Sequence, residues 1–163
     1  MFYADDVLPE VKSSRLTETI DAFQSVASER NTKFEIGRLH VVLVEGNAKK
    51  SSAERIMWTG RTDTNKRVVF ADSAVLTSLS SENAADFRGL EIPLLSDVCK
   101  LADVASVVEK RVMELKNGEL IPIEKGMYVV VKIISCKGHT LRGAAVAKTT
   151  IRESHSLQLP FII

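Results

Sequence analysis

The feature that most constrains the fold is a β-hairpin pattern near the C-terminal end. Apolar residues alternate with other residues through 127–135, and Lys137-Gly138 separates this stretch from a second strand expected at 140–149. A two-residue period predicts a strand, and a Gly-containing turn between two such stretches predicts a hairpin. One face of the second strand carries small side chains, which suit the crowded interior of a small barrel. That face comprises Leu141, Gly143, Ala145 and Ala147.

Three more strands are expected earlier in the chain, because Leu39, Val41 and Leu43 repeat with a period of two and two further short stretches flank a polar turn. Five short antiparallel strands, with a gap between the third and the fourth, match a five-stranded OB-like barrel. Closing the sheet removes its exposed edges. The expected fold class is therefore mainly β, with an N-terminal helix and a helical insertion between strands 3 and 4. The three strands cover 36 to Glu45-Gly46, 55–62 and 66–70.

A long helix is predicted before the barrel. Pro9 and Glu10 suit the first turn of a helix of about 20 residues, since proline is tolerated at its first position and acids favour its N-terminus. Polar residues 30–33 are expected to form a short link. The apolar stripe must pack on this domain or on a neighbouring one. It consists of Leu16, Ile20, Phe23 and Ala27.

The insertion predicts a second amphipathic helix. Apolar residues between Val98 and Leu115 recur at spacings of three and four, and this stripe packs on its own domain or on a partner chain. Residues 78–85 are expected to be a mobile loop. The organisation expected is a linker helix at 1–35, a barrel at 36–152 with its insertion at about 73–124, and a tail at 153–163.

Charge is strongly segregated along the chain, although the net charge is only +1. Residues 36–70 and 125–152 together hold 13 basic and 3 acidic side chains, a net charge of +10, and the rest of the chain carries −9. Such segregation favours a basic surface that faces a polyanion. The alternative is a set of solvated loops whose charges scatter over all faces.

The sequence lacks catalytic and metal-binding patterns. Its eight glycines are isolated, so it contains no phosphate-binding Gly-rich loop, and no nucleophile motif joins its three histidines to a Ser or Cys. Two cysteines, Cys99 and Cys136, are too few for an iron–sulfur cluster, and the Cys and His spacing does not match a zinc site. The chain on its own is expected not to be an enzyme and to hold no metal.

Binding to a phosphate backbone explains the basic segments. Lys and Arg concentrate in loops and turns between strands, where they can line one groove and bind RNA through counterion release. Trp58, Tyr128 and Phe70 are available for base stacking, although Trp58 and Phe70 suit the core better. With only 6% aromatic residues, phosphate and shape contacts are expected to dominate. The candidate RNA-binding residues are Lys49, Lys50, Arg55, Arg61, Lys66, Arg67, Lys132, Lys137, His139, Arg142 and Lys148.

Short motifs along the expected strands also occur in a recognisable order. They are Val42-Leu43-Val44-Glu45-Gly46, Gly60-Arg61-Thr62, Val68-Val69-Phe70, residues 126–133 and Leu141-Arg142-Gly143. This ordered set resembles a TRAM domain, and more narrowly the C-terminal TRAM domain of MiaB-type radical-SAM tRNA methylthiotransferases. Residues 5–20 are similar to the linker helix that precedes TRAM in that family, and residues 149–153 are similar to its eukaryotic, largely mitochondrial branch.

The resemblance implies a tRNA partner, bound near the anticodon arm, and gives Arg61, Lys132 and Arg142 a tRNA-contact role. It implies 4Fe–4S and S-adenosylmethionine only for the full-length family enzyme, because this sequence has no Cys-x3-Cys-x2-Cys motif. A separate catalytic domain or chain is a further implied partner.

Two functions stay open on the sequence: an RNA-binding module that engages tRNA, and a protein-interaction domain that uses the amphipathic helices and the apolar tail at 157–163. No apolar run reaches the roughly 18 residues of a membrane span, so no membrane partner is expected. The acidic start and the two cysteines point to an intracellular location, mitochondrial or cytoplasmic by resemblance.

Overall fold

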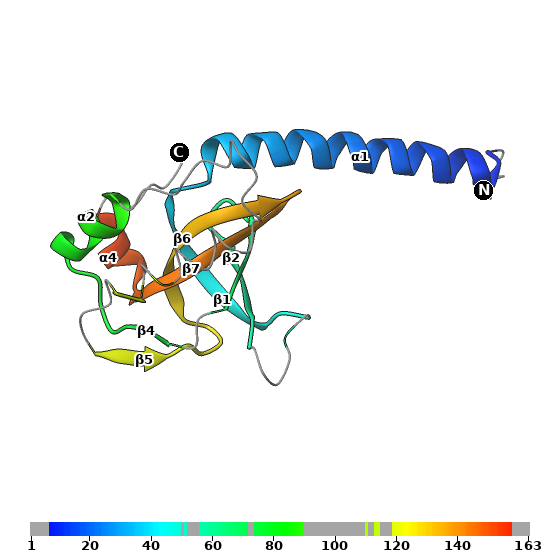
Figure 1. Ribbon diagram of the computed structural model, residues 1–163. Coiled ribbons are helices and arrows are strands. Elements are labelled where there is room, and N and C mark those ends of the chain that lie inside the picture. Colours follow the sequence, from blue (N-terminus) through cyan, green and yellow to red (C-terminus); the bar gives the residue numbers. More distant parts are fainter. Residues whose placement is uncertain are drawn as a thin grey trace.

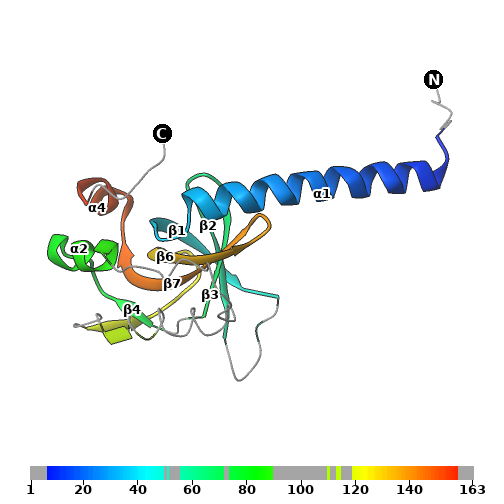
Figure 2. The same ribbon diagram turned by 45° about the horizontal axis from the view of Figure 1, so that its top comes forward.

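A mainly β, five-stranded barrel with a long helix projecting from one side makes up most of the computed structural model (Figures 1 and 2). The structure describes residues 7–49, 51, 56–71, 74–89, 110, 113–114 and 119–157. The expected fold class is confirmed. The barrel strands are β1 (Leu39–Asn47), β2 (Trp58–Thr62), β3 (Arg67–Phe70), β6 (Tyr128–Lys137) and β7 (Thr140–Thr149), and the helix is α1 (Pro9–Phe34).

The barrel closes through one parallel strand pair, so the expectation of an entirely antiparallel barrel is wrong. Its strands are ordered β3-β2-β1-β6-β7, and β3 pairs with β7 in parallel, with Val68 opposite Leu141 and Phe70 opposite Gly143. The other neighbours in this order are antiparallel. An odd number of strands that alternate in direction must close with one parallel pair. That pair brings the segments after β2 and before β7 together.

Two glycines allow the barrel strands to approach closely. A Cβ on Gly60 would lie 2.4 Å from the carbonyl oxygen of Leu43, and one on Gly143 would lie 2.4 Å from Cγ1 of Val131. Both distances are well inside van der Waals contact with ordered neighbours. Only glycine fits these positions without displacing the neighbouring strand.

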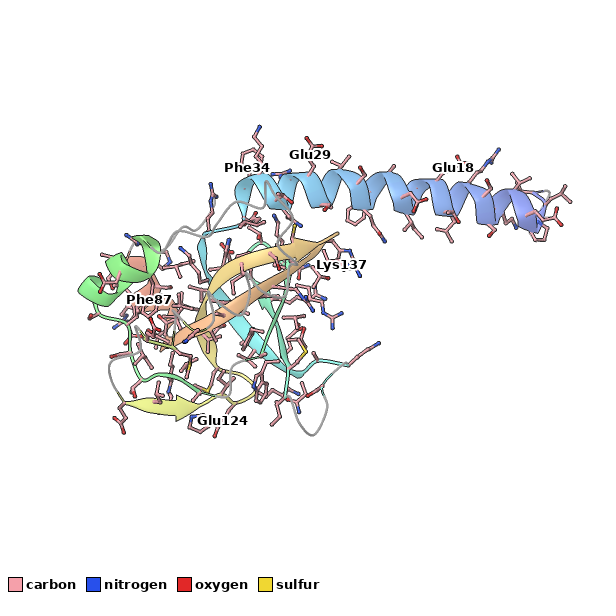
Figure 3. All side chains as sticks on the ribbon, viewed as in Figure 1. Glu18, Glu29, Phe34, Phe87, Glu124 and Lys137 are labelled. Carbon is pink, nitrogen blue, oxygen red and sulfur yellow. The ribbon has the colours of Figure 1, made fainter. Side chains whose placement is uncertain are left out.

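Apolar side chains form two separate clusters, one on each face of the curved sheet. The barrel interior includes Val42, Phe70, Val131 and Leu141. The second cluster lies on the other face of β6 and β7, beneath α2 (Ser81–Gly89). Residues 78–85 were expected to be a loop, but the helix begins at 81 because Phe87, with no exposed surface, anchors it on the sheet (Figure 3).

The strands differ from the expected ones in faces and lengths. Leu39 and Val41 share a face, as expected, but they pack in the outer cluster, while the barrel interior takes Val42 and Val44. β1 also continues past its expected end at Glu45-Gly46, because a bulge at that point absorbs the extra residue. A bulge in the β6–β7 pairing likewise moves Ala147 into the outer cluster, away from the face expected for it.

Further short elements complete the described chain. β4 (Ala74–Leu76) and β5 (Leu120–Pro122) pair with each other, and β4 joins β7 at Leu76. α4 (Ile151–Ser156) begins with a capping box formed by Thr150 and Glu153, before the expected start of the tail at 153. The predicted helix at 98–115 lies outside the described residues, apart from 110 and 113–114.

α1 is longer than expected and is exposed along most of its length. It runs without interruption through residues 30–33, which were wrongly expected to form a link. Two buried residues explain this: Asn31, and Glu35 one turn later on the same face of the helix. Both are bound by Lys66 of the barrel. The apolar stripe stays largely exposed and packs on this domain only at its inner end: Leu16 is 62% exposed, and Phe23, which contacts His139, is still 59% exposed. Figure 1 shows the N-terminal part of α1 extending away from the barrel.

Candidate nucleic-acid interface

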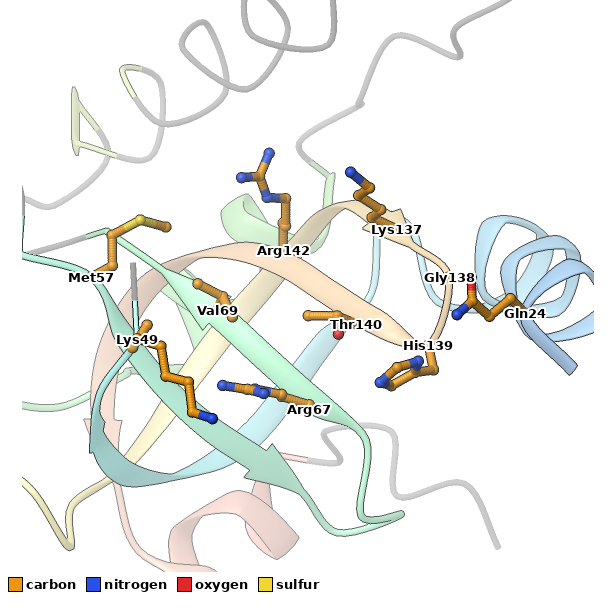
Figure 4. A pocket seen from close by; sticks show the side chains of 11 residues that line it. Gln24, Lys49, Met57, Arg67, Val69, Lys137, Gly138, His139, Thr140 and Arg142 are labelled. Atoms are coloured by element: carbon orange, nitrogen blue, oxygen red, sulfur yellow. The ribbon is translucent and has the colours of Figure 1, made fainter. Parts of the chain in front are cut away.

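A hollow of about 560 Å³ lies over the parallel seam between β3 and β7. Arg67 and Val69 line it from β3, and Thr140 and Arg142 line it from β7. Figure 4 shows these side chains around the opening, with Gln24 of α1 at one end. Five of the candidate RNA-binding residues therefore meet here: Lys49, Arg67, Lys137, His139 and Arg142.

A second hollow of about 660 Å³ lies between α1 and the β2–β3 turn. Arg67 and His139 line both hollows, so the two adjoin, and we refer to them together as the basic groove. The second hollow adds two expected cations, Arg61 and Lys66, and one that was not expected, Arg30 of α1. One wall of the groove is thus the inner end of the helix.

A buried polar cluster fixes that end of α1 to the barrel. Lys66 Nζ donates to Glu35 Oε1 and, at 2.9 Å, to Asn31 Oδ1. Asn31 Nδ2 in turn donates to the carbonyl oxygen of Gly138 over 3.1 Å. His40 Nε2 of β1 lies 2.8 Å from Glu35 Oε2. One cluster therefore joins α1, the β2–β3 turn and the β6–β7 turn, which are the walls of the second hollow.

The protonation states in this cluster follow from burial and charge. Burial lowers the pKa of His40, outweighing the nearby negative charges of Glu35 and Asp63, which raise it. Burial also raises the pKa of Glu35, but the Lys66 hydrogen bond and the charges of His40, Lys66 and Arg38 outweigh it, so the net pKa is lowered. At neutral pH the cluster thus holds an ionised Glu35, whose two oxygens face Lys66 and His40.

Further contacts hold the β6–β7 turn against α1. The Sγ of Cys136 donates to the carbonyl oxygen of Ser28 at 3.7 Å and lies 3.3 Å from Thr32 Oγ1. One turn further along α1, the ring of Phe23 meets the ring of His139, with centroids 6.1 Å apart and planes tilted by 41°. The helix and the hairpin tip are therefore joined at several points along the groove.

The expected cations differ in how they are engaged. Arg61 Nε lies 3.3 Å from Glu45 Oε1, and its guanidinium also donates to Asn65. Arg67 Nε donates to the hydroxyl of Thr59 at 3.2 Å. Within the part of the chain that the structure describes, no ion pair engages Lys49, Arg67, Lys137 or Arg142. These four cations are available to a polyanion.

Lys132 is not a surface cation, although a tRNA contact was expected for it. Its side chain has no exposed surface, and its Nζ donates to the carbonyl oxygens of Phe87 at 2.9 Å and Arg88 at 3.2 Å. Burial lowers its pKa. Lys132 therefore caps the C-terminal end of α2 from inside the fold and cannot reach a phosphate from there.

The remaining expected cations lie apart from the groove or outside the described chain. Lys148 is exposed on β7 but lines neither hollow. Lys50 and Arg55 lie outside the described residues. They remain predictions.

Sequence reasoning missed the contribution of α1 to the groove. Gln24 and Arg30 line its hollows, and Phe23 lies in the second one. The signal was present in the spacing, because Phe23, Ala27 and Arg30 follow at i, i+4 and i+7, on one face of a helix. Because residues 30–33 were expected to form a link, Arg30 was not recognised as part of this helical face.

The aromatics expected to be available for stacking lie elsewhere. Phe70 is in the barrel interior with 1% of its surface exposed, and Trp58 packs against the same cluster. Tyr128 lines a smaller hollow of about 310 Å³ beside α4, with Val41, Leu43 and Ile151. The aromatic residues at the basic groove are Phe23 and His139.

The described residues do not provide a site for an iron–sulfur cluster. Among them, no three His, Cys, Asp or Glu side chains gather where a metal ion could be held. Cys136 is described, and its thiol is directed to the backbone of α1. In the same set of residues, no helix is long and apolar enough to span a membrane.

Comparison with known proteins places the similarity in one class of enzymes. The chain is 32% identical over 150 residues to the mitochondrial tRNA methylthiotransferase CDK5RAP1 of Rattus norvegicus, a match that covers 92% of this chain and 19% of the relative. The Homo sapiens protein of the same name is 31% identical over 150 residues, with 92% and 18% covered. No protein-family model matches the chain.

A bacterial relative matches a shorter part more closely. The tRNA-2-methylthio-N(6)-dimethylallyladenosine synthase of Amoebophilus asiaticus is 50% identical over 68 residues, which cover 42% of this chain and 13% of that enzyme. The chain spans about a fifth of the length of the CDK5RAP1 relatives. The matched part is their C-terminal region, and the catalytic region is not covered.

Proposed function

Because this chain is homologous over 92% of its length to the C-terminal, TRAM-like region of tRNA methylthiotransferases, we propose that it is a tRNA-binding module. One observation carries the proposal: the fold gathers Lys49, Arg67, Lys137 and Arg142, which are separated in sequence, around one groove. A groove lined with unpaired cations binds a phosphate backbone by releasing its counterions.

The arrangement of the cations supports a contact with successive phosphates. Lys137 and Arg142 come from one hairpin, Arg67 from the strand beside it, and Lys49 from the turn that follows β1. Neighbouring cations repel one another, so a basic groove of this kind favours an anionic ligand. Arg61 already pairs with Glu45, and Lys66 with Glu35. We therefore propose that these two cations mainly hold the walls of the groove in place and that the four unpaired cations bind the phosphates.

Binding to total tRNA, measured by fluorescence anisotropy at about 50 and 200 mM salt, tests the proposal. Affinity is expected to fall steeply with salt, since several phosphate contacts release counterions together. No binding at the lower salt concentration would contradict the proposal.

A matched pair of double variants then tests the groove itself. Lys137→Glu with Arg142→Glu is expected to weaken tRNA binding at least tenfold and to reduce the salt slope by about two, one for each lost phosphate contact. The control, Lys125→Glu with Arg152→Glu, makes the same change in net charge at exposed residues outside both hollows. Equal losses in the two variants would show that net charge, and not the groove, determines binding.

We further propose that the module acts with a methylthiotransferase catalytic part, on the same polypeptide or on another, and holds the anticodon arm of tRNA for it. The similarity to tRNA methylthiotransferases supports this, as does the restriction of the match to their C-terminal region. In this proposal the iron–sulfur cluster and S-adenosylmethionine belong to that catalytic part. Cross-linking of bound tRNA tests the location, and cross-links confined to the acceptor stem would contradict it.

A second function is favoured by the exposed stripe of α1. Leu16 and Ile20 are 62% and 42% exposed, on a helix that extends beyond the barrel (Figure 2). We propose that this stripe packs against the same catalytic part, which would remove its apolar surface from water. Leu16→Glu with Ile20→Glu is expected to abolish association with a relative's catalytic part in sedimentation and to leave tRNA binding unchanged. Unchanged association would contradict the second function.

A further inference from the structure

The aromatic pair at the basic groove is not explained by phosphate binding. Phe23 of α1 and His139 of the β6–β7 turn are in ring contact, and both line the hollow that also contains Arg30 and Arg67. Phe23 nevertheless keeps 59% of its side chain exposed, and His139 is exposed as well. A ring that contributes so little buried surface adds little to the stability of the fold.

Two further contacts hold the pair in place. The hydrogen bond from Asn31 to the carbonyl oxygen of Gly138 fixes the residue directly before His139. The contact between Cys136 and the backbone of Ser28 fixes the same hairpin to α1 about one helical turn before Asn31. The two elements that carry the rings are therefore held together before any ligand arrives, which reduces the entropy lost on binding.

We propose that the basic groove binds an unpaired segment of RNA, with one base stacked on Phe23 and His139. This inference rests on the proposed RNA-binding function. A base inside a duplex is covered on both faces by its neighbours, so only an unpaired base offers a ring to a side chain. Stacking on aromatic side chains beside a cationic track is the usual means of holding single strands.

The cations on either side of the rings fit the flanking phosphates of such a segment. Lys137 and Arg142 lie in the first hollow, Arg30 lies in the second, and Arg67 and His139 belong to both. The base site is therefore in the middle of the groove, with positive charge before and after it. This placement gives the aromatic pair a role in selecting unpaired over paired RNA.

The test uses the full chain and a single-stranded RNA of about eight nucleotides that contains 2-aminopurine, a base whose fluorescence is quenched by stacking. Phe23→Ala is expected to weaken binding about five- to hundredfold, the range for loss of one base–aromatic stack, and to abolish the quenching. Its salt slope should stay unchanged, because no phosphate contact is lost. Binding to a duplex of the same length should change less than about twofold.

Leu16→Ala is the matched control, since Leu16 belongs to the same stripe of α1 and is 62% exposed, but lines neither hollow. It should leave both affinities unchanged, and Phe23→Trp should keep the quenching. Unchanged thermal midpoints show that the variants fold. Equal effects of Phe23→Ala and Leu16→Ala on the single strand, or equal losses on single strand and duplex, would overturn the inference.

The two proposals fail separately. If reversal of Lys137 and Arg142 abolishes tRNA binding while Phe23→Ala changes neither affinity nor quenching, the groove binds RNA and the base site is wrong. If the wild-type chain binds no RNA at low salt, the proposed function is wrong, and the inferred base site is wrong as well.

Discussion

Lys132 and Lys137 stand five residues apart on β6, Lys132 in the middle of the strand and Lys137 at its last residue, and their surroundings are opposite. Beneath α2, Lys132 has no exposed surface and donates to the last carbonyls of that helix. At the tip of the hairpin, Lys137 is exposed and lines the basic groove beside α1. Figure 3 labels Phe87 beside α2 and Lys137 at the hairpin tip.

The difference lies in what packs against the hairpin. Over Lys132 lies α2, held by the apolar side chains of Ala84 and Phe87. Over the hairpin tip lies α1, which is held by the polar cluster, by the contact of Cys136 with Ser28 and by the ring contact of Phe23 with His139. These contacts leave the cations of the groove uncovered. The region beneath α2, which we call the α2 end, is built mainly for stability, and the hairpin tip beside α1, which we call the α1 end, holds the groove for which RNA binding is proposed; the following changes should separate these two contributions.

The largest expected effect is on stability at the α2 end. Phe87→Ala removes a ring with no exposed surface and should cost about 3–5 kcal/mol of unfolding free energy, measured by urea denaturation. The matched control is Phe34→Ala, which removes the same ring where 45% of it is exposed and should cost far less. The folded fraction of Phe87→Ala should keep its salt slope for tRNA. A lower slope would show that the two ends are coupled.

The next effect is a pH dependence at the α1 end. The folded chain holds a lowered pKa at His40, where burial outweighs the charges of Glu35 and Asp63 and the charge of Lys66 acts in the same direction as burial. The unfolded chain therefore binds more protons as the pH falls below the ordinary value of 6.5, and stability must fall with it, by at most about 1.4 kcal/mol for each pH unit. Above that value this contribution is fully present.

Urea denaturation at several pH values between neutrality and the acid range measures this loss. His40→Gln should remove the part of the loss that begins near 6.5, whereas Phe87→Ala should retain it. The lowered pKa of Glu35 adds a second loss below about 4.5, its ordinary value. Stability of the wild-type chain that rises on acidification through 6.5 would contradict the assignment.

The smallest expected effect is that of Lys132→Met. The change removes the hydrogen bonds to Phe87 and Arg88 but also removes a buried charge, so the free energy of unfolding should change by only about 1 kcal/mol. Affinity for tRNA should stay within about twofold of wild type, because the side chain does not reach the surface. A tenfold loss of affinity at unchanged stability would make Lys132 an RNA contact after all.

Much of the barrel could be predicted from the sequence. A period of two along 127–135 and 140–149, and the turn at Lys137-Gly138, predict the hairpin, because alternation is a local property of each strand. The sequence could not predict the bulges near Gly46 and in the β6–β7 pairing, which shift later residues to the other face. Residues 81–89 carry too weak an apolar pattern to predict a helix, and Phe87 forms it by packing on the sheet.

The candidate site divides in the same way. The sequence by itself determined that positive charge is concentrated in two segments, since charge is a property of each residue. Only the tertiary structure decided which cations share a groove, because that depends on the parallel closure of β3 on β7 and on the docking of α1. It also buried Lys132 and brought Phe23 to His139. Burial and proximity depend on the element that packs opposite, and no local pattern in the sequence specifies that element.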